Sequence, residues 1–355
     1  MFLAFISITL LGFLWLMFDR WALLRSENEL DGLLSREAGF LFNNVIFLGI
    51  AFATFWGTIF PMISELVVAD KIAVSAPFFN KVNGPIFLAL LILMGVGPLL
   101  GWRRSTMGGL RRNFTWPIVF ALGMVVLLTV TGVRDPSPLV VLGACAFVTG
   151  TIGQEFYRGA HARRTVTGES WWRAAVGLMR RNQRRYGGYI VHLGIVLVAV
   201  GITGQSFFQS DAQGNLAVGE SMQVGPYTLT YQGLSSRTTG THEEVFANLL
   251  VSKNGKPLGT LHPSRNLYFK NPDQPTSEVG LKVTLTEDLY TVLAGWEKNG
   301  ATASFKAYVN PLMVWMWIGG LVLMLGTVVA VWPHGQRQRA TVRSRASREV
   351  TQPAG

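Results

Sequence analysis

One histidine lies inside a long apolar segment, and it is the residue of this chain best suited to do chemistry. The segment reads YGGYIVHLGIVLVAV (186–200), with His192 as its only imidazole. Imidazole is a common ligand of buried metal ions and of haem iron. At membrane depth an ionisable side chain is costly unless it has a partner. The residues alone leave three roles open for His192: a hydrogen bond to a neighbouring helix, a haem or metal ligand, and a proton relay.

Small residues flank this histidine. Gly188 and Gly194 lie on either side of it, and such spacing lets another helix, or a flat macrocycle, approach closely. His192 follows Arg185, the last charged residue before the segment, by seven residues, which is about 10 Å of helix. None of the other predicted spans contains a histidine. A second axial ligand would therefore have to come from another polypeptide.

The other candidate residues have weaker signals. Cys145 is the single cysteine, so disulfides, zinc sites and CxxC redox pairs within the chain are excluded, and we expect it in a helix interface. We expect His161 in a solvated loop, and surface or structural roles for His242 and His262. Glu155 stands at a span end, where a charged group usually marks the membrane interface. No carboxylate pair or nucleophile–base arrangement is visible, which argues against a self-contained hydrolase or transferase.

The composition predicts a membrane protein. Hydrophobic residues make up 49% of the chain and charged residues only 14%, against about 25% charged in soluble domains. Apolar stretches near the length of a membrane span recur. We predict seven, at about 2–18, 40–60, 85–102, 115–133, 138–155, 187–206 and 311–332. The predicted fold class is an all-α polytopic membrane protein with an inserted extracytoplasmic β-rich domain.

The distribution of positive charge predicts the topology. Of 31 Lys and Arg residues, 20 lie in 19–38, 103–112, 156–186 and 334–355, whereas 61–84 and 134–137 hold three together. By the positive-inside rule the first group is cytoplasmic. With seven spans the N-terminus is then outside and the C-terminus inside. The net charge of +11 is thus a topology signal, with membrane lipid and no nucleic acid as the expected partner of the basic segments.

A segment of different character separates the last two spans. Alternating residues such as YTLTY (227–231) are typical of strands, and Asn254-Gly255 and Asn299-Gly300 indicate hairpins. We predict about seven strands, near 215–220, 223–233, 245–253, 256–262, 279–286, 289–296 and 302–308. The predicted domains are a six-helix region (1–206), an extracytoplasmic β-domain (207–310), a final helix (311–333) and a disordered, basic cytoplasmic tail (334–355).

Motifs distributed along the chain resemble the C-terminal half of the CcmF-type cytochrome c haem lyases, within the haem-handling membrane protein superfamily. The similarity runs in order from about residue 1 to 332. Its motifs are SRE (35–37), FNN (42–44), WGTIFP (56–61), PFFN (77–80), GVGPLL (95–100), EFYRG (155–159), GGYIVHLG (187–194) and LHP (261–263). The last span, with Trp315, Trp317, Gly319 and Gly320, also fits.

The resemblance implies a role in cytochrome c maturation at the bacterial inner membrane. It implies that His192 is one of two axial ligands of a membrane haem b. The implied partners are a periplasmic haem chaperone, an apocytochrome c with CxxCH thiols and a thiol-reducing maturation component. The family's Trp-rich haem-binding segment and second haem b ligand belong to its N-terminal half, and neither is present here. We therefore expect an N-terminal haem lyase subunit as a further partner, and lyase activity only together with it.

Two alternatives stay open at the level of sequence. The chain could be the related lyase for a nitrite-reductase-type cytochrome with an unusual haem motif. It could also be a non-catalytic membrane assembly scaffold whose β-domain docks partners, with His192 in a structural role.

Overall fold

The computed structural model describes residues 2–24, 32–70, 72–101, 106–271, 273–297 and 299–333. The predicted tail 334–355 lies outside these residues. The chain divides into two compact units, one of residues 1–86 and 97–111 and the other of residues 87–96 and 112–355. The second unit contains His192 and the β-domain, and we describe each unit by itself.

The first unit is helical. It holds α1 (Phe2–Asp19), α2 (Trp21–Leu24), α3 (Arg36–Val68), the first half of α4 (Ala76–Val96) and the 3-10 helix η1 (Gly97–Leu99). Ser35 begins α3 by accepting a hydrogen bond from the Ala38 amide, which satisfies one of the free amides of the first turn. A Cβ on Gly57 would come within 2.7 Å of the Phe79 ring, so the WGTIFP and PFFN motifs pack together.

Helix α3 is longer than its predicted span. The sequence predicts that the span ends near residue 60, but the helix continues through Pro61 to Val68 and ends at Ala69, which adopts φ 55°. A proline ends a helix only where its missing N–H and its ring cannot be accommodated. The segment 61–84 is therefore mostly the end of α3 and the start of α4, with a short connection between them.

The second unit is built around a helical core. Its long helices are α5 (Met107–Val130), α6 (Pro136–Thr167), α8 (Gln183–Phe208) and α9 (Met313–Val331), with the short α7 (Trp171–Arg181) between α6 and α8. Buried side chains of α4, α6 and α8, including Leu91, Val148, Ile152, Tyr189 and Val196, form one core cluster. Cys145 belongs to it at 3% exposure, with its Sγ 4.0 Å from the Val196 carbonyl oxygen, so its predicted place in a helix interface is confirmed.

Six helices of the described residues are long and apolar enough to cross a membrane: α3, α4 with η1, α5, α6, α8 and α9. The remaining predicted span, 2–18, corresponds to α1, an apolar helix of 18 residues. At 1.5 Å per residue α1 is about 27 Å long, just under the thickness of the hydrocarbon core. The chain is a membrane protein with a β-rich domain, as its composition predicts.

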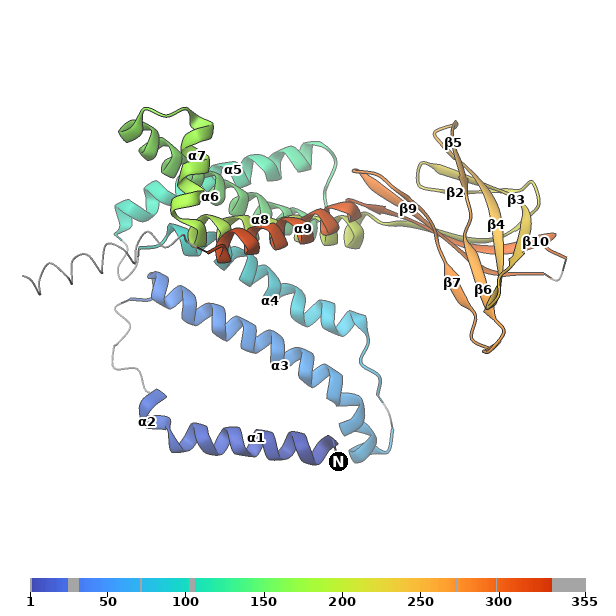
Figure 1. Ribbon diagram of the computed structural model, residues 1–355, viewed down its shortest axis with the longest axis horizontal. Helices are drawn as coiled ribbons and strands as arrows, with labels where there is room; N and C mark the ends of the chain where they lie inside the picture. Colours follow the sequence, from blue (N-terminus) through green and yellow to red (C-terminus); the bar gives the residue numbers. More distant parts are fainter. Residues whose placement is uncertain are drawn as a thin grey trace, which may run out of the picture. The chain divides into compact units, whose positions relative to one another are not determined.

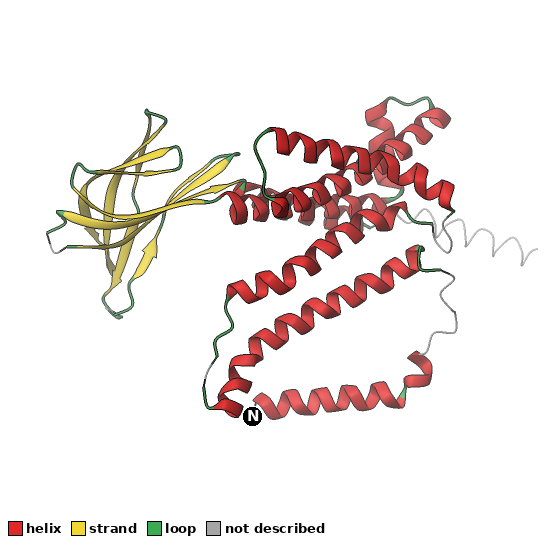
Figure 2. Cartoon of the chain, turned by 180° about the vertical axis from the view of Figure 1, so that it is seen from behind, coloured by secondary structure: helices red, strands yellow, loops and turns green. Residues whose placement is uncertain are grey.

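The β-domain is a two-sheet sandwich that connects directly to α8 and α9 (Figure 1). One sheet has the strand order β1-β10-β9-β8 and the other β2-β3-β4-β6-β7, with β5 paired to β4. The strands are β1 (Ser210–Ala217), β2 (Ser221–Val224), β3 (Tyr227–Thr238), β4 (His242–Lys253), β5 (Lys256–Leu261), β6 (Ser264–Tyr268), β7 (Thr276–Glu278), β8 (Gly280–Val283), β9 (Glu287–Trp296) and β10 (Thr302–Pro311). Figure 2 shows the strands of this sandwich from behind, in yellow.

Within the described residues, ten strands therefore replace the seven predicted. The Asn254-Gly255 hairpin is confirmed between β4 and β5, with φ 49° and 79° at these residues, which the turn requires. Gly300, with φ 68°, likewise lies in the connection from β9 to β10. Strands β6 and β7 were not predicted because they are short, with five and three residues, and largely polar. The prediction also merged β2 and β3, which are separated by the turn at Gly225.

Candidate functional site

His192 lies in the middle of α8 and has no partner in the described part of the chain. Its ring is half-buried, and its Nδ1 atom is buried without a hydrogen-bond partner. A buried polar atom without a partner costs free energy, so such an atom in a native site needs an explanation. The sequence left a hydrogen bond to a neighbouring helix as one of three possible roles for His192. No such hydrogen bond from Nδ1 to a described helix is observed.

Glycines hold the opposite side of α8 tightly against α9. The glycines in this contact are Gly187, Gly194 and Gly201 on α8 and Gly319 and Gly326 on α9, and Gly204 contacts Pro311 and Leu312 just before α9. A Cβ on Gly194 would lie 2.7 Å from the Leu323 backbone nitrogen and 2.8 Å from the Gly319 carbonyl oxygen. The predicted close approach of another helix is thus confirmed, and the helix is α9. At about 100° per residue, His192 lies about 160° around α8 from Gly194. The close packing against α9 therefore leaves the imidazole free.

The face of α8 that carries His192 is open beside the ring. Gly188 lies four residues before His192, which places both on one face of the helix. A Cβ built on Gly188 would meet no atom within 4 Å. A flat ligand that bonds the imidazole could therefore lie against the backbone of α8 at this glycine.

These observations fit a single protein ligand to a haem iron better than a metal site made by this chain. Within the described residues, no group of three or more His, Cys, Asp or Glu side chains could hold a metal ion. A haem iron needs only one or two protein ligands, because the macrocycle supplies the other four. His192 offers one imidazole, a half-buried position and an open flank, so it fits the haem predicted from the sequence resemblance.

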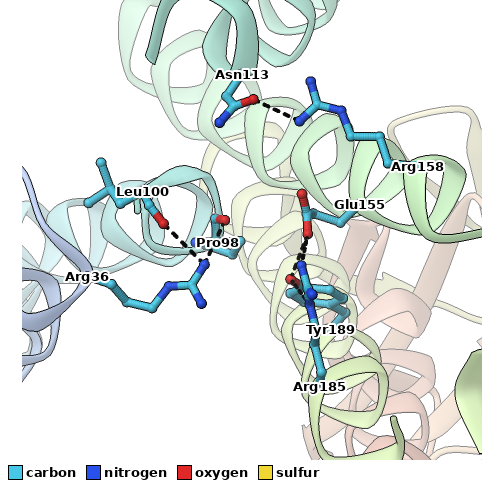
Figure 3. A network of polar contacts seen from close by, with 8 residues as sticks. All are labelled: Arg36, Pro98, Leu100, Asn113, Glu155, Arg158, Arg185 and Tyr189. Carbon is cyan, nitrogen blue, oxygen red and sulfur yellow. Dashed lines mark hydrogen bonds and ion pairs between the residues drawn. The ribbon is translucent and has the colours of Figure 1, made fainter. Parts of the chain in front are cut away.

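An ionic network around the buried carboxylate of Glu155 lies on the cytoplasmic side of His192 in the predicted topology. Glu155 of α6 accepts a hydrogen bond from the Arg185 guanidinium and, at 3.1 Å, another from the Tyr189 hydroxyl. The Arg185 Nε also donates to this hydroxyl at 3.1 Å. Figure 3 shows how the three side chains converge from α6 and α8. Glu155 is 9% exposed, so the group predicted at a span end also has partners inside the protein. It is a buried link between two helices.

The residues of this network belong to or lie near motifs of the sequence, but the motifs alone did not predict that these side chains meet. Arg185 and Tyr189 are four residues apart and so share a face of α8. Tyr189 belongs to the GGYIVHLG motif, and Arg185 lies two residues before it. Glu155 begins the EFYRG motif. The same EFYRG motif supplies Arg158, whose Nη1 donates to the Asn113 Oδ1 at 2.9 Å. The motif therefore joins α6 to both α5 and α8 (Figure 3).

In the first unit, a second pair of motifs meets through an arginine. The Arg36 Nη2 atom donates to the carbonyl oxygens of Pro98 at 3.0 Å and Leu100 at 3.2 Å (Figure 3). These carbonyls end the helical run α4–η1, where a positive charge is favourable. The SRE and GVGPLL motifs are thus joined in a helix-end contact, for which packing is a sufficient explanation.

The remaining described histidines have local roles. His161 lies on α6 rather than in a loop, because this helix continues to Thr167, and its ring stacks with those of Tyr157 and Trp171. The His242 Nδ1 atom lies 3.0 Å from the hydroxyl of Thr239. The His262 ring packs edge-on against Phe246. Their roles toward any partner stay open.

The chain is similar to proteins of cytochrome c biogenesis. Residues 207–311 match the family model described as the CcmF C-terminal beta-sandwich. The cytochrome c-type biogenesis protein ccl1 of Rhodobacter capsulatus is 28% identical over 90% of this chain and 47% of its own length. The cytochrome c-type biogenesis protein CcmF of Escherichia coli is 26% identical over 98% of this chain and 51% of its own length.

A solved structure gives the same result in three dimensions. The structure of the cytochrome c heme lyase CcmF matches with a TM-score of 0.71 and 27% identity, over 85% of this chain and 46% of that chain. This chain spans about half the length of the relatives it matches. These similarities confirm the resemblance that the sequence motifs predict: the chain is similar to the CcmF-type cytochrome c haem lyases over most of its own length.

Proposed function

We propose that this chain acts in cytochrome c maturation as the C-terminal portion or subunit of a haem lyase that attaches haem covalently to apocytochrome c. The observation that carries the proposal is His192, a half-buried imidazole whose Nδ1 has no partner in the described part of the chain, in a helix long and apolar enough to span a membrane. Its motif and the β-sandwich both fall within the similarity to CcmF-type relatives.

In this proposal His192 would hold a membrane haem b by bonding its iron. Bound haem b would supply one electron to the iron of the haem being attached. The chain's own contribution is to hold the imidazole in place. The glycine contact with α9 fixes one side of α8, and the network of Glu155, Arg185 and Tyr189 fixes its rotation against α6. Gly188 leaves room for the macrocycle edge.

The proposed partners would supply the thiols that accept haem and the second ligand of the haem iron. The chain's one cysteine, Cys145, is buried between helices, so the thiols that accept haem belong to an apocytochrome c, kept reduced by a thiol-reducing component. An N-terminal haem lyase subunit would supply the second axial ligand and a Trp-rich surface for incoming haem, delivered by a periplasmic haem chaperone. The complex would lie in the bacterial inner membrane, with the β-sandwich outside.

A haem spectrum tests the ligand assignment. We would purify the chain together with its presumed N-terminal partner and record the reduced haemochrome spectrum. His192→Ala should remove most of the b-type absorbance, because α8 offers no second imidazole. The matched control is His161→Ala on the exposed surface of α6, which should leave the spectrum unchanged. Added imidazole should restore part of the absorbance in His192→Gly, which a purely structural role would not predict.

Other outcomes would favour the alternatives. Full b-type absorbance in His192→Ala, with the partner's histidine still essential, would contradict the ligand role and leave the assembly scaffold as the better function. Stable stoichiometric haem in this chain without its partner would contradict a site shared between two polypeptides, since we expect weak or no binding there.

A further inference from the structure

The turn between β8 and β9, residues 284–286, and the adjoining strand β8 carry exposed apolar side chains that the proposed haem chemistry does not use. Leu285 is 65% exposed, and Leu281 and Val283 on β8 are 48% and 51% exposed. Residues 281 and 283 point to the same face of the sheet, because side chains alternate along a strand. On a soluble domain such a row at a sheet edge would favour aggregation.

The strand register places this turn beside the start of α9. Glu287, the first residue of β9, pairs with Pro311, the last residue of β10. The turn therefore lies beyond the end of β10, next to the residues that begin the membrane-spanning helix. Two hydrogen bonds hold it there: the Leu312 amide donates to the Thr286 carbonyl oxygen, and the Trp315 indole donates to the Leu285 carbonyl oxygen, both at 2.9 Å. Figure 1 shows β9 reaching from the sandwich to α9.

Several backbone groups of the turn have hydrogen-bond partners within the protein, as an environment with little water requires. Besides the two carbonyl groups bonded to α9, the Thr284 amide donates to the Asp288 carboxylate at 3.2 Å, and the Glu287 amide donates to the Thr284 hydroxyl at 3.1 Å. Unsatisfied backbone groups are what exclude most loops from a bilayer. This turn has internal partners for four of them.

The two carboxylates next to the turn do not oppose an apolar environment. Glu287 forms an ion pair with Lys253 at 2.7 Å. Asp288 is 4% exposed, and this burial raises the pKa of its carboxyl group. Neither group presents a free charge on the surface that Leu285 occupies.

We propose that the β8–β9 turn rests in the outer interfacial layer of the lipid bilayer, with Leu285 and Val283 in contact with lipid. The partner is lipid rather than protein because the turn is hydrogen-bonded to Leu312 and Trp315 at the start of a helix long and apolar enough to cross a membrane, and Trp317 in the same part of α9 is also exposed. Tryptophan and adjacent apolar residues are typical of the membrane–water interface. The contact would fix the tilt of the β-sandwich relative to the membrane, and it does not depend on haem.

Depth-dependent fluorescence quenching tests this proposal on the full chain in lipid nanodiscs. A cysteine is introduced as Leu285→Cys, or as Val283→Cys, in a Cys145→Ala background and labelled with an environment-sensitive fluorophore. Nitroxide-labelled lipids are then added to the nanodisc. The matched control is Val218→Cys, which is 54% exposed in the β1–β2 connection. Val218 lies eight residues along from Ser210, about 27 Å from the membrane end of β1.

We expect blue-shifted emission and at least threefold stronger quenching by nitroxide lipid at positions 285 and 283 than at 218. Equal quenching at the three positions would overturn the proposal, because the turn would then be in water. Blue-shifted emission without lipid quenching would also overturn it, because another polypeptide or a second copy of the chain would then cover the turn. Two labelling positions guard against loss of the Trp315 contact in one variant.

Discussion

At the scale of single residues, the membrane helices contain a few buried polar groups, and these groups differ in whether they have hydrogen-bond partners. Glu155 is buried and engaged by Arg185 and Tyr189, whereas the Nδ1 atom of His192 has no described partner. Because an isolated charge in an apolar core is costly, Glu155 is tolerated only through its partners. His192 has no such compensation within the described chain, which is the physical reason to look for a ligand there.

Glu155→Gln should lower the thermal midpoint of the detergent-solubilised chain. The glutamine still accepts one hydrogen bond, but the ion pair with Arg185 is lost, and hydrogen bonds to charged groups contribute about 1.5–3 kcal/mol. The matched control is Glu169→Gln, which breaks the partly exposed pair with Arg163. Intrinsic fluorescence during heating measures both variants. An equal shift in the two would mean that the buried network has no special role in joining α6 to α8.

At the scale of elements, α8 is held by two different kinds of contact. Towards α9 it offers glycines and meets backbone, whereas towards α6 it offers Tyr189 and Val196 and meets side chains. Helices without a hydrophobic driving force between them associate through such close backbone packing. The helix that carries His192 is thereby fixed from two sides.

Gly194→Ala should separate α8 from α9 and lower the thermal midpoint. The added Cβ would lie 2.7 Å from a backbone nitrogen of α9, which cannot move aside as a side chain can. Overpacking of this kind costs about 1–3 kcal/mol. Gly188→Ala on the same helix is the matched control, because no atom lies within 4 Å of its Cβ, and alanine favours a helix. A midpoint unchanged in Gly194→Ala would contradict the tight contact.

At the scale of the whole chain, an apolar helical part and a β-sandwich are joined by only two connections, α8 to β1 and β10 to α9. Both helices meet the sandwich at the same end, because β1 and β10 are paired, with Ser210 opposite Val309. The sandwich must therefore lie on one side of the membrane. The distribution of Lys and Arg predicts that this is the outer side.

Reporter insertions test this orientation. Alkaline phosphatase, which needs disulfides and so folds only outside the cytoplasm, should be active when inserted at Gly240 in the β3–β4 turn and inactive at Gly168 after α6. A fluorescent protein that matures in the cytoplasm should give the opposite pattern. Phosphatase activity at Gly168 but not at Gly240 would reverse the topology and place His192 near the outer surface.

The sequence by itself determined the class of protein, most of its long helices and the character of the β-domain. These are local properties: apolar runs of span length, strand alternation, and Asn-Gly pairs that accept positive φ. Its motifs also determined the family resemblance and singled out His192. Short polar strands such as β6 and the passage of α3 through Pro61 were missed, because neighbouring strands or helices stabilise them against their local preference.

Only the tertiary structure decided which residues meet. Glu155 and Arg185 are 30 positions apart in sequence, and Gly194 and Leu323 are farther apart still, so no local pattern predicts either contact. The same holds for Leu285, which is an ordinary turn residue until the register of β9 and β10 places it beside Trp315. The sequence supplied a histidine suited to bind iron. The packing of α8 left that imidazole without a partner among the described residues and its flank open, because the glycines turn the other side of the helix to α9.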